Sequence, residues 1–346
     1  MKLGSLKEGG RDGTLIVVSR DLTRAVRASA IAPILQRALE NWSNTAPRLN
    51  ALYERLNGVV ASAAPATAAT AATNIDGEPV FALDVGALAA PLPRAYEFVD
   101  GSAYLPHVER VRRARGAEVP ASFYTDPLMY QATSAGFLGA RDPILAASEE
   151  WGIDLEAEVV VVTDDVAMGV SAAAAAQHIQ LVGLVNDVSL RGLIPGELAK
   201  GFGFLQSKPR SALSPVFVTP DELGDAWQGS KLNLPMRTQI NGQWFGEAEC
   251  GVDMQFSFAD LVAHVAKTRP LSAGTLVGSG TIANEDVSKG ASCLAERRTV
   301  ETLRDGKPTT PFLKFGDTVR IEITDVAGAS LFGAIEQTVT RYQPRV

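Results

Sequence analysis

The alternation of polar and apolar residues is clearest between Gly152 and Asp187. Acidic residues alternate with apolar or small ones from Asp154 to Glu158, and a run of valines follows. Because successive side chains on a strand point to opposite faces, this alternation predicts a strand with Glu156 and Glu158 on one face. The valine run predicts that the strand is central and buried. We therefore expect two carboxylates on one face of a buried strand, about 6–7 Å apart along it.

Residues 1–95 have the pattern of a small unit of their own. Two strand-like segments, 2–7 and 14–18, flank a turn rich in glycine and predict a β-hairpin. Apolar residues recur at helical spacing over 31–56. The Ala/Thr-rich segment 59–73 predicts a surface loop or a weak helix.

Two prolines, Pro91 and Pro93, predict an extended linker near residue 95. Beyond it, strand patterns outnumber helical ones, and Asn241-Gly242 is typical of a type I′ hairpin turn. The remaining segments are predicted as helices over 108–115, 172–182 and 258–268, as loops over 119–143 and 201–215, and as strands over 216–218 and 314–323. We therefore expect an α+β protein with a small domain at 1–95 and a larger, β-rich domain at 96–346.

Composition and charge narrow the range of functions. The chain has 346 residues, of which 46% are hydrophobic, enough for a sizeable core and for about two domains. A net charge of −7 and a pI near 5.2 argue against nucleic acid or an anionic membrane as the main partner. Two cysteines make no disulfide framework, and no apolar run approaches the ~18–20 residues of a membrane span. The N-terminus has no signal-peptide pattern, so we expect a cytoplasmic protein that acts on a small molecule.

The paired carboxylates suggest a metal site. Two like charges on a buried face repel each other and are costly to remove from water unless a cation lies between them. A hard divalent cation with oxygen ligands meets this need. Glu156, Glu158 and a third carboxylate, Asp187, therefore form a candidate site for Mg²⁺ or Mn²⁺. The alternatives are a solvated strand face for Glu156 and Glu158, and a helix cap for Asp187.

Five short motifs follow one another along the chain. They are Asp100 with His107, Asp154-x-Glu156-x-Glu158, Asn186-Asp187-x-Ser189-x-Arg191, Lys208 before Ser214-Pro215, and Gly278-Ser279-Gly280-Thr281. In this order they resemble the fumarylacetoacetate hydrolase (fumarylacetoacetase) superfamily over residues 96–325. That superfamily includes acylpyruvases, oxaloacetate decarboxylases and 2-oxo-alkenoate hydratases.

The resemblance implies a fold, a metal site and catalytic residues. It implies a β-rich C-terminal domain of rolled, mixed sheets after a small SH3-like N-terminal domain, and a homodimer. It implies that Mg²⁺, Mn²⁺ or Ca²⁺ is bound by Asp100, Glu156, Glu158 and Asp187. It implies catalytic roles for His107, Lys208 and Glu296, and substrate contacts from Tyr130, Arg191 and Thr281. Glu109 is an alternative to Glu296 as the partner of His107, and Lys200 is an alternative to Lys208.

The implied reaction is metal-dependent hydrolysis of a carbon–carbon bond in a 1,3-diketo acid, fumarylacetoacetate-like or acylpyruvate-like, within the catabolism of aromatic compounds such as tyrosine. His107 would act as the general base. A 2-oxo acid hydratase or decarboxylase that uses the same metal site is the alternative. A non-catalytic binding protein is a third hypothesis, and the presence of His107 as a candidate base argues against it.

Four residues depart from the superfamily pattern and leave the substrate open. Ile194 replaces a glutamine of the fumarylacetoacetase branch, and Arg110 replaces a glutamate of the acylpyruvase branch. Pro209-Arg210 follows the lysine where Ser-Phe is usual. The two other histidines, His178 and His264, lie on predicted helices and are expected to be structural.

Overall fold

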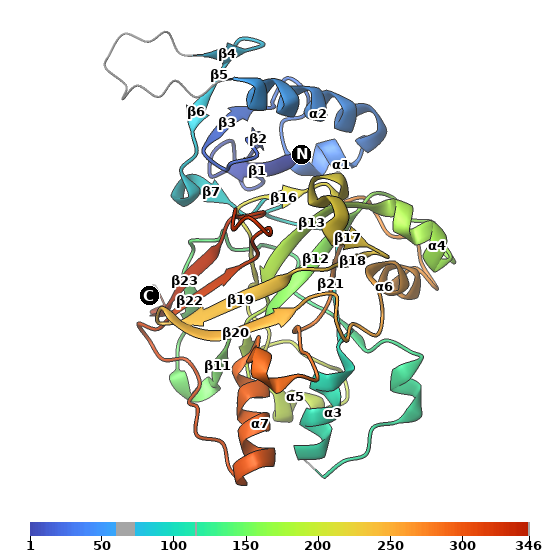
Figure 1. Cartoon of the computed structure of the whole chain (residues 1–346), viewed down its shortest axis with the longest axis vertical. Helices are drawn as coiled ribbons and strands as arrows, with labels where there is room; N and C mark the ends of the chain where they lie inside the picture. The colour runs from blue at the N-terminus through green and yellow to red at the C-terminus, as the bar shows by residue number, and fades with distance from the viewer. Residues whose placement is uncertain (60–72, 115, 345–346) are drawn as a thin grey trace.

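The computed structural model describes residues 1–59, 73–114 and 116–344, and it has an α+β fold rich in strands (Figure 1). The α+β class predicted from the sequence is therefore confirmed. The prediction for segment 59–73 falls on residues 60–72, which lie outside the described residues. No helix in the described part of the chain is both long and apolar enough to cross a membrane.

The N-terminal strands form an antiparallel meander. β1 (Lys2–Leu6) pairs with β2 (Thr14–Val18), which confirms the predicted hairpin. β2 pairs in turn with β3 (Arg24–Arg27), and β3 pairs with the short β6 (Phe81–Ala82).

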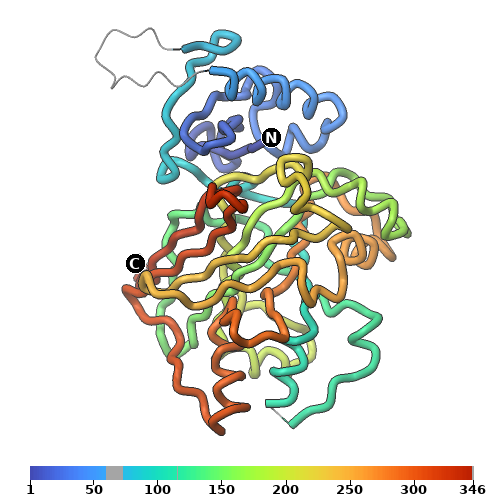
Figure 2. Tube along the Cα trace, in the orientation of Figure 1, coloured from blue at the N-terminus to red at the C-terminus, as the bar shows by residue number. Residues whose placement is uncertain are grey.

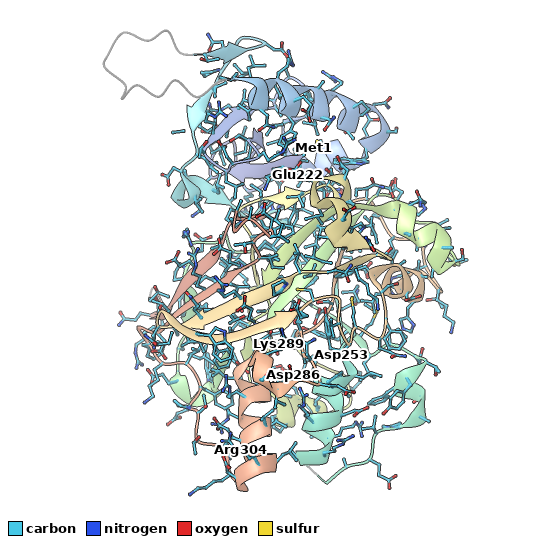
Figure 3. All side chains as sticks on the ribbon, viewed as in Figure 1. Met1, Glu222, Asp253, Asp286, Lys289 and Arg304 are labelled. Atoms are coloured by element: carbon cyan, nitrogen blue, oxygen red, sulfur yellow. The ribbon has the colours of Figure 1, made fainter. Side chains whose placement is uncertain are left out.

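Two helices cover one face of this meander. The predicted helical segment 31–56 forms α1 (Leu35–Leu39) and α2 (Trp42–Gly58). Leu49 and Leu56 of α2 join the same apolar core as strand β2, and Figure 1 shows α2 lying across the meander. Just before β1, where the meander meets the rest of the chain, the α-amino group of Met1 lies 3.4 Å from a carboxylate oxygen of Glu222 (Figure 3).

One sheet runs through both parts of the chain. β1 pairs with β16 (Phe217–Val218), so that Lys2 lies opposite Val218. From β16 the sheet continues through β13, β12, β21, β8 and β9. Their bounds are β8 (Phe98–Gly101), β9 (Met129–Gln131), β12 (Ala157–Thr163), β13 (Ile179–Asn186) and β21 (Leu276–Gly278). The N-terminal meander therefore extends the central sheet (Figure 2), while the division at residue 95 and its SH3-like character stay predictions.

The valine run of β12 is buried on both faces of the sheet. Val159 and Val161 join one apolar core, and Val160 and Val162 join the other. This is the arrangement that the run of apolar residues predicted for a central strand. Because close-packed side chains hold both faces, the strand that carries the acidic pair has little freedom to move.

A second, five-stranded sheet lies beside the central one (Figure 1), in the order β10, β23, β22, β19, β20. Its strands are β10 (Ile144–Ala146), β19 (Pro235–Ile240), β20 (Gln243–Glu249), β22 (Thr318–Glu322) and β23 (Ile335–Arg341). Asn241 and Gly242 both have positive φ between β19 and β20, which confirms the predicted hairpin. The remaining short strands are β4 (Asn74–Ile75), β5 (Glu78–Pro79), β7 (Leu88–Ala89), β11 (Ile153–Asp154), β14 (Ser189–Leu190), β15 (Ala212–Leu213), β17 (Trp227–Gln228) and β18 (Lys231–Leu232).

Three helices gather at one end of the sheets, at the bottom of Figure 1. They are α3 (Leu105–Ala114), α5 (Ile194–Leu198) and α7 (Leu294–Asp305). Away from them, α4 (Ala172–Ala175) packs against α6 (Phe258–Val265). The candidate catalytic residues lie between the three gathered helices and the central sheet.

Three predictions from the sequence pattern were wrong in part. The loop predicted over 201–215 contains the short strand β15. The helix predicted over 172–182 ends in a 3₁₀ turn at Ala176–His178, and strand β13 begins at Ile179. The alanine-rich start favours a helix, but the apolar residues after it gain more by pairing with β12 and burial in the sheet. The loop predicted over 119–143 contains β9, an edge strand of the central sheet.

Candidate active site and metal centre

Three buried carboxylates meet at one end of the central strands. Asp100 lies on β8, Glu158 lies on β12, and Asp187 directly follows β13. One oxygen of each lies within 4.8 Å of the others. Strand β21 runs between β8 and β12, and a Cβ added to its Gly278 would stand 2.2 Å from an oxygen of Asp100. A glycine at that position therefore lets Asp100 and Glu158 approach each other.

These three carboxylates fit a divalent cation. Both oxygens of Glu158 are buried and have no hydrogen-bond partner among the described residues. Burial, together with Asp100 and Asp187, raises the pKa of Glu158 well above its ordinary value. Burial and the neighbouring Asp187 raise the pKa of Asp100 to about 7. Carboxylate oxygens that repel one another, with those of Glu158 left without donors, are the ligands that a hard cation needs.

The fourth predicted ligand, Glu156, stands apart from this group of three. Its carboxylate forms ion pairs with Arg191 and with Lys208, whose Nζ lies 2.8 Å from Oε2, and it accepts a hydrogen bond from Ser189. Two cations thus neutralise Glu156, in contrast to Glu158. Its predicted role as a metal ligand stays a prediction.

Lys208 connects Glu156 to the group of three. Its Nζ atom lies 2.7 Å from an oxygen of Asp187, and its side chain is buried. Burial opposes its charge, but Asp187 and Glu156 together raise the pKa of Lys208 above its ordinary value. Lys200, the alternative in the sequence, is exposed. The structure therefore places Lys208 at the cluster.

Glu197 of α5 holds the segment that leads to Lys208. Its carboxylate accepts hydrogen bonds from the backbone N–H groups of Leu205, Gln206 and Ser207. These bonds lower the pKa of Glu197 to about 2, the hydroxyl of Ser207 contributing most. One carboxylate thus fixes the three residues before the lysine.

His107 lies in the first turn of α3 and contacts Glu296. Its Nδ1 atom lies 3.1 Å from Oε2 of Glu296, and Arg110 donates a 2.6 Å hydrogen bond to the other oxygen. Glu109, the alternative partner, accepts hydrogen bonds from Arg113 and Tyr124 instead. The structure therefore pairs His107 with Glu296.

The predicted substrate-contacting residues face the same small cavity of about 170 Å³. The hydroxyl of Tyr130 donates a hydrogen bond to Asp187, and Arg191 pairs with Asp154 at 2.8 Å. Thr281 follows Gly280, whose φ of 76° produces a tight turn. The predicted site residues that line the cavity are Asp100, His107, Tyr130, Glu156, Arg191, Lys208 and Thr281. The carboxylates of Asp100 and Glu156, the ammonium group of Lys208 and the imidazole of His107 therefore face one space.

Comparison with known families agrees with this geometry. The family described as fumarylacetoacetate (FAA) hydrolase C-terminal matches residues 97–340. The one described as fumarylacetoacetase N-terminal domain 2 matches residues 1–94. The chain belongs to the fumarylacetoacetate hydrolase family. The resemblance drawn from the five motifs is thereby confirmed.

Relatives within the fumarylacetoacetate hydrolase family have different activities. An oxaloacetate tautomerase, mitochondrial, from Xenopus laevis is 26% identical over 209 residues, which cover 59% of this chain and 57% of that protein. A crystal structure described as a 2-hydroxyhepta-2,4-diene-1,7-dioate isomerase from Mycobacterium abscessus matches 99% of this chain and 100% of its own, with a TM-score of 0.64 and 17% identity. A crystal structure of a maleylpyruvate hydrolase from Sphingobium also matches 99% of this chain and 100% of its own, with a TM-score of 0.63 and 14% identity. At these identities the two structures show the shared fold.

Sequence reasoning missed three residues of this family site. Asp154 was noted only as part of a motif, yet it accepts hydrogen bonds from the first N–H groups of α7 and pairs with Arg191. Its place two residues before Glu156 on an alternating segment could have revealed it. Ser211, which donates to Asp187, and Phe204, whose ring lies edge-on to Tyr130, have no such signal because the fold brings them from a loop.

Proposed function

We propose that this chain is a divalent-metal-dependent hydrolase that cleaves a carbon–carbon bond in a 1,3-diketo acid, fumarylacetoacetate-like or acylpyruvate-like, in the catabolism of aromatic compounds. One observation carries the proposal. The unpartnered carboxylate of Glu158 lies in a buried acidic cluster next to the cavity that His107 and Lys208 line. Family membership supports it, since the family includes hydrolases of this type.

In the proposed mechanism, Asp100, Glu158 and Asp187 would hold the metal ion, with Glu156 as the predicted fourth ligand. When bound, a divalent cation supplies Lewis acidity, which polarises the carbonyl groups of a chelating substrate. Two oxo groups separated by one carbon, or a 2-oxo group and its neighbouring carboxylate, provide such a chelate. The distal part of the substrate then extends away from the cluster.

The proton transfers would be carried out by His107 and Lys208. The carboxylate of Glu296 favours a proton on Nδ1 of His107 and leaves Nε2 free to take a proton from water. That water attacks the acyl carbonyl carbon, and the bond to the neighbouring carbon breaks. The released carbanion is the enolate of an oxo acid, and the ammonium group of Lys208 stabilises it or supplies its proton. The products are a carboxylic acid and an oxo acid, which is a 2-oxo acid from an acylpyruvate and a 3-oxo acid from a fumarylacetoacetate-like substrate.

The substrate carboxylate would lie among Arg191, Tyr130 and Thr281. All three line the cavity. Arg191 presents a planar guanidinium suited to a carboxylate, although Asp154 and Glu156 already share its charge. Tyr130 and Thr281 add hydroxyl groups.

A second candidate function uses the same residues without cleaving a bond. The relative described as an oxaloacetate tautomerase supports proton transfer on a 2-oxo acid. Here His107 would take a proton from the carbon next to the oxo group and return it to oxygen. Hydration or decarboxylation of a 2-oxo acid belongs to the same group of alternatives.

Turnover assays with Mg²⁺ would separate these functions. We expect fumarylacetoacetate to be cleaved to fumarate and acetoacetate, or acetylpyruvate to be cleaved to acetate and pyruvate. We expect oxaloacetate and 2-hydroxypentadienoate to be poor substrates. The variant His107→Ala is the matched control, because it lacks the base and keeps the acidic cluster. Faster turnover of oxaloacetate than of either diketo acid would favour the second candidate. Inertness toward all four would contradict both.

The homodimer and the cytoplasmic location predicted from the sequence stay predictions. Sedimentation equilibrium of the purified protein would test the first. Fractionation of the source cells would test the second.

A further inference from the structure

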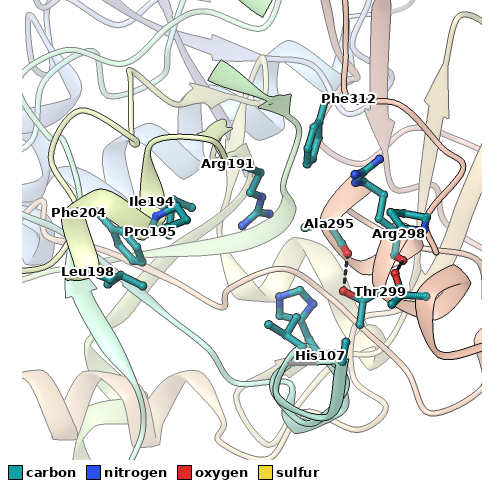
Figure 4. Close-up of a pocket in the computed structure, with 14 residues that line it drawn as sticks. His107, Arg191, Ile194, Pro195, Leu198, Phe204, Ala295, Arg298, Thr299 and Phe312 are labelled. Carbon is teal, nitrogen blue, oxygen red and sulfur yellow. Dashed lines mark hydrogen bonds between the residues drawn. The ribbon is translucent and has the colours of Figure 1, made fainter. Parts of the chain in front are cut away.

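A second, larger cavity of about 370 Å³ adjoins the candidate site. The two cavities share His107, Arg191, Ile194 and Phe204 as lining residues. Figure 4 shows His107 and Arg191 between two walls, one with Leu198 and Phe204 and the other with Arg298 and Phe312. A molecule held at the acidic cluster can therefore extend past His107 into this second space.

The walls of the larger cavity come from the three gathered helices. Val111 and Ala114 belong to α3, Pro195 and Leu198 to α5, and a polar stripe belongs to α7. That stripe consists of Ala295, Arg298, Thr299 and Thr302, which recur at helical spacing and so form one face of α7. The lining is thus apolar on two sides and polar on the third. Such a lining suits a carbon chain that carries a polar group at one point.

Arg298 is the charged group of this polar face that has no carboxylate partner. It is half-buried and forms no ion pair among the residues that the structure describes. Its guanidinium carbon lies 4.4 Å from the centre of the Phe312 ring, and its Nη1 atom donates to the carbonyl oxygen of Thr310. Glu301, one turn further along α7, accepts hydrogen bonds from Thr310 rather than from Arg298.

The position of this guanidinium has a chemical consequence. Stacking on Phe312 and the bond from Nη1 fix its plane, so that the edge formed by Nε and Nη2 remains available. A fixed guanidinium edge matches the two oxygens of a carboxylate. Because the cavity walls exclude water from one side, the attraction is stronger than at an exposed arginine.

We propose that this cavity binds the distal arm of the substrate and that Arg298 binds a carboxylate at the end of that arm. The substrates are then diketo acids with a second carboxylate on an unbranched apolar arm. This inference rests on the proposed function, since it assumes that the 2-oxo end of the substrate lies at the acidic cluster. A methyl arm, as in acetylpyruvate, would leave the cavity without a ligand group.

A series of 2,4-dioxo acids tests the proposal. All the acids carry the same unbranched chain of methylene groups as their arm. The arm ends in a carboxylate, a carboxamide or an ammonium group. Acetylpyruvate, which has only a methyl group there, is the short reference. With Mg²⁺ present, we expect kcat/KM to be roughly 10- to 100-fold higher for the carboxylate than for the carboxamide, as for one charge-assisted bidentate pair. The ammonium compound should be the poorest of the three.

Variants of Arg298 assign the preference to that residue. Arg298→Gln should bring the carboxylate-to-carboxamide ratio of kcat/KM close to one. Arg298→Lys should keep part of the preference for the carboxylate arm. A lysine keeps the positive charge but cannot donate the two parallel hydrogen bonds of a guanidinium. The matched control is Arg304→Gln on the same helix, whose side chain is 70% exposed and pairs with Asp305. It should keep the full preference.

The outcomes separate this inference from the proposed function. If no acid is cleaved, calorimetric titration of the same series with Mg²⁺ still reports the arm preference. Tighter binding of the carboxylate, lost in Arg298→Gln, would then support the arm site and contradict the hydrolase. Cleavage of all arms with equal kcat/KM would support the hydrolase and overturn the arm site. If Arg298→Gln does not fold, the unmodified protein still tests the arm site. The arm site is overturned if this protein turns over the ammonium compound as fast as, or faster than, the carboxylate compound.

Discussion

The imidazole of His107 lies 3.1 Å from the carboxylate of Glu296, although the two residues are 189 positions apart in the sequence. Arg110, on the same helix as His107, holds the other oxygen of that carboxylate. Arg110 also donates to the backbone carbonyl groups of Asn284 and Glu285. The candidate base is therefore oriented by a carboxylate that two helices and a loop fix in place.

Loss of this carboxylate should impair catalysis without removing the metal site. We expect His107→Ala to lower kcat by about 10²–10⁴-fold, and Glu296→Gln to lower it by less, since the amide still contacts the imidazole. Steady-state kinetics and Mn²⁺ titration followed by electron paramagnetic resonance measure the two effects separately. Glu109→Gln is the control and should match the unmodified protein. If Glu296→Gln lowered the Mn²⁺ affinity by as large a factor as it lowers kcat, the assignment of Glu296 as a positioning residue would be contradicted.

Glu158→Gln should separate stability from metal binding. In the metal-free protein the buried carboxylate is repelled by Asp100 and Asp187, so a neutral amide should raise the melting temperature. The same change removes a ligand, so the melting temperature should no longer rise when Mg²⁺ or Mn²⁺ is added. Differential scanning calorimetry with and without metal gives the melting temperature of the metal-free protein and its change when metal is added. A variant that is still stabilised by metal as strongly as the unmodified protein would refute the ligand assignment.

Lys208 and Lys200 should respond differently to the same substitution. Lys208→Met leaves Asp187 buried without its cation and leaves Glu156 with Arg191 alone, which should cost about 3–5 kcal/mol of stability and at least 10²-fold in kcat. Lys200→Met is exposed and should change the unfolding free energy by no more than about 0.5 kcal/mol. Urea unfolding and kinetics of both variants test the choice. Larger losses of stability and kcat in Lys200→Met than in Lys208→Met would identify Lys200 as the active-site lysine.

Glu197 should make stability dependent on acid pH. Its pKa is lowered to about 2 from an ordinary value of 4.5, because Ser207 and three backbone N–H groups bond its charged form. The stabilisation is therefore fully present above about 4.5 and is lost as the pH falls toward about 2. We expect Glu197→Gln to lower the unfolding free energy by about 1–3 kcal/mol at neutral pH, with a difference that shrinks across that window. A difference that does not depend on pH would show that charge is not the cause.

The sequence predicted the elements whose signal is local. The alternation before the valine run predicted the strand that carries Glu158, and Asn241-Gly242 predicted a hairpin. The start of β13 was mistaken for a helix because an alanine-rich segment has helix propensity, and only pairing with β12 overrides it. The choice of Glu296 over Glu109 could not be made from spacing, because it depends on how α3 and α7 pack.

The metal site illustrates the same limit. Motif order brought Asp100, Glu158 and Asp187 into one hypothesis, and the structure places them together. The ion pairs of Glu156 with Arg191 and Lys208 were not foreseen, because they depend on side chains that two loops deliver. The unpaired state of Arg298 is likewise visible only after the helices are packed.

The pairing of β1 with β16 delays completion of the sheet during synthesis. Lys2 leaves the ribosome long before Val218, its partner, has been translated. At about 5–20 residues per second the interval is about 10–40 s. During this interval Ser5 and Leu6 can already pair with β7, but Lys2 and Leu3 have no partner strand. This short length of β1 is the part of the nascent meander that is able to join a strand of another chain until the later strand arrives.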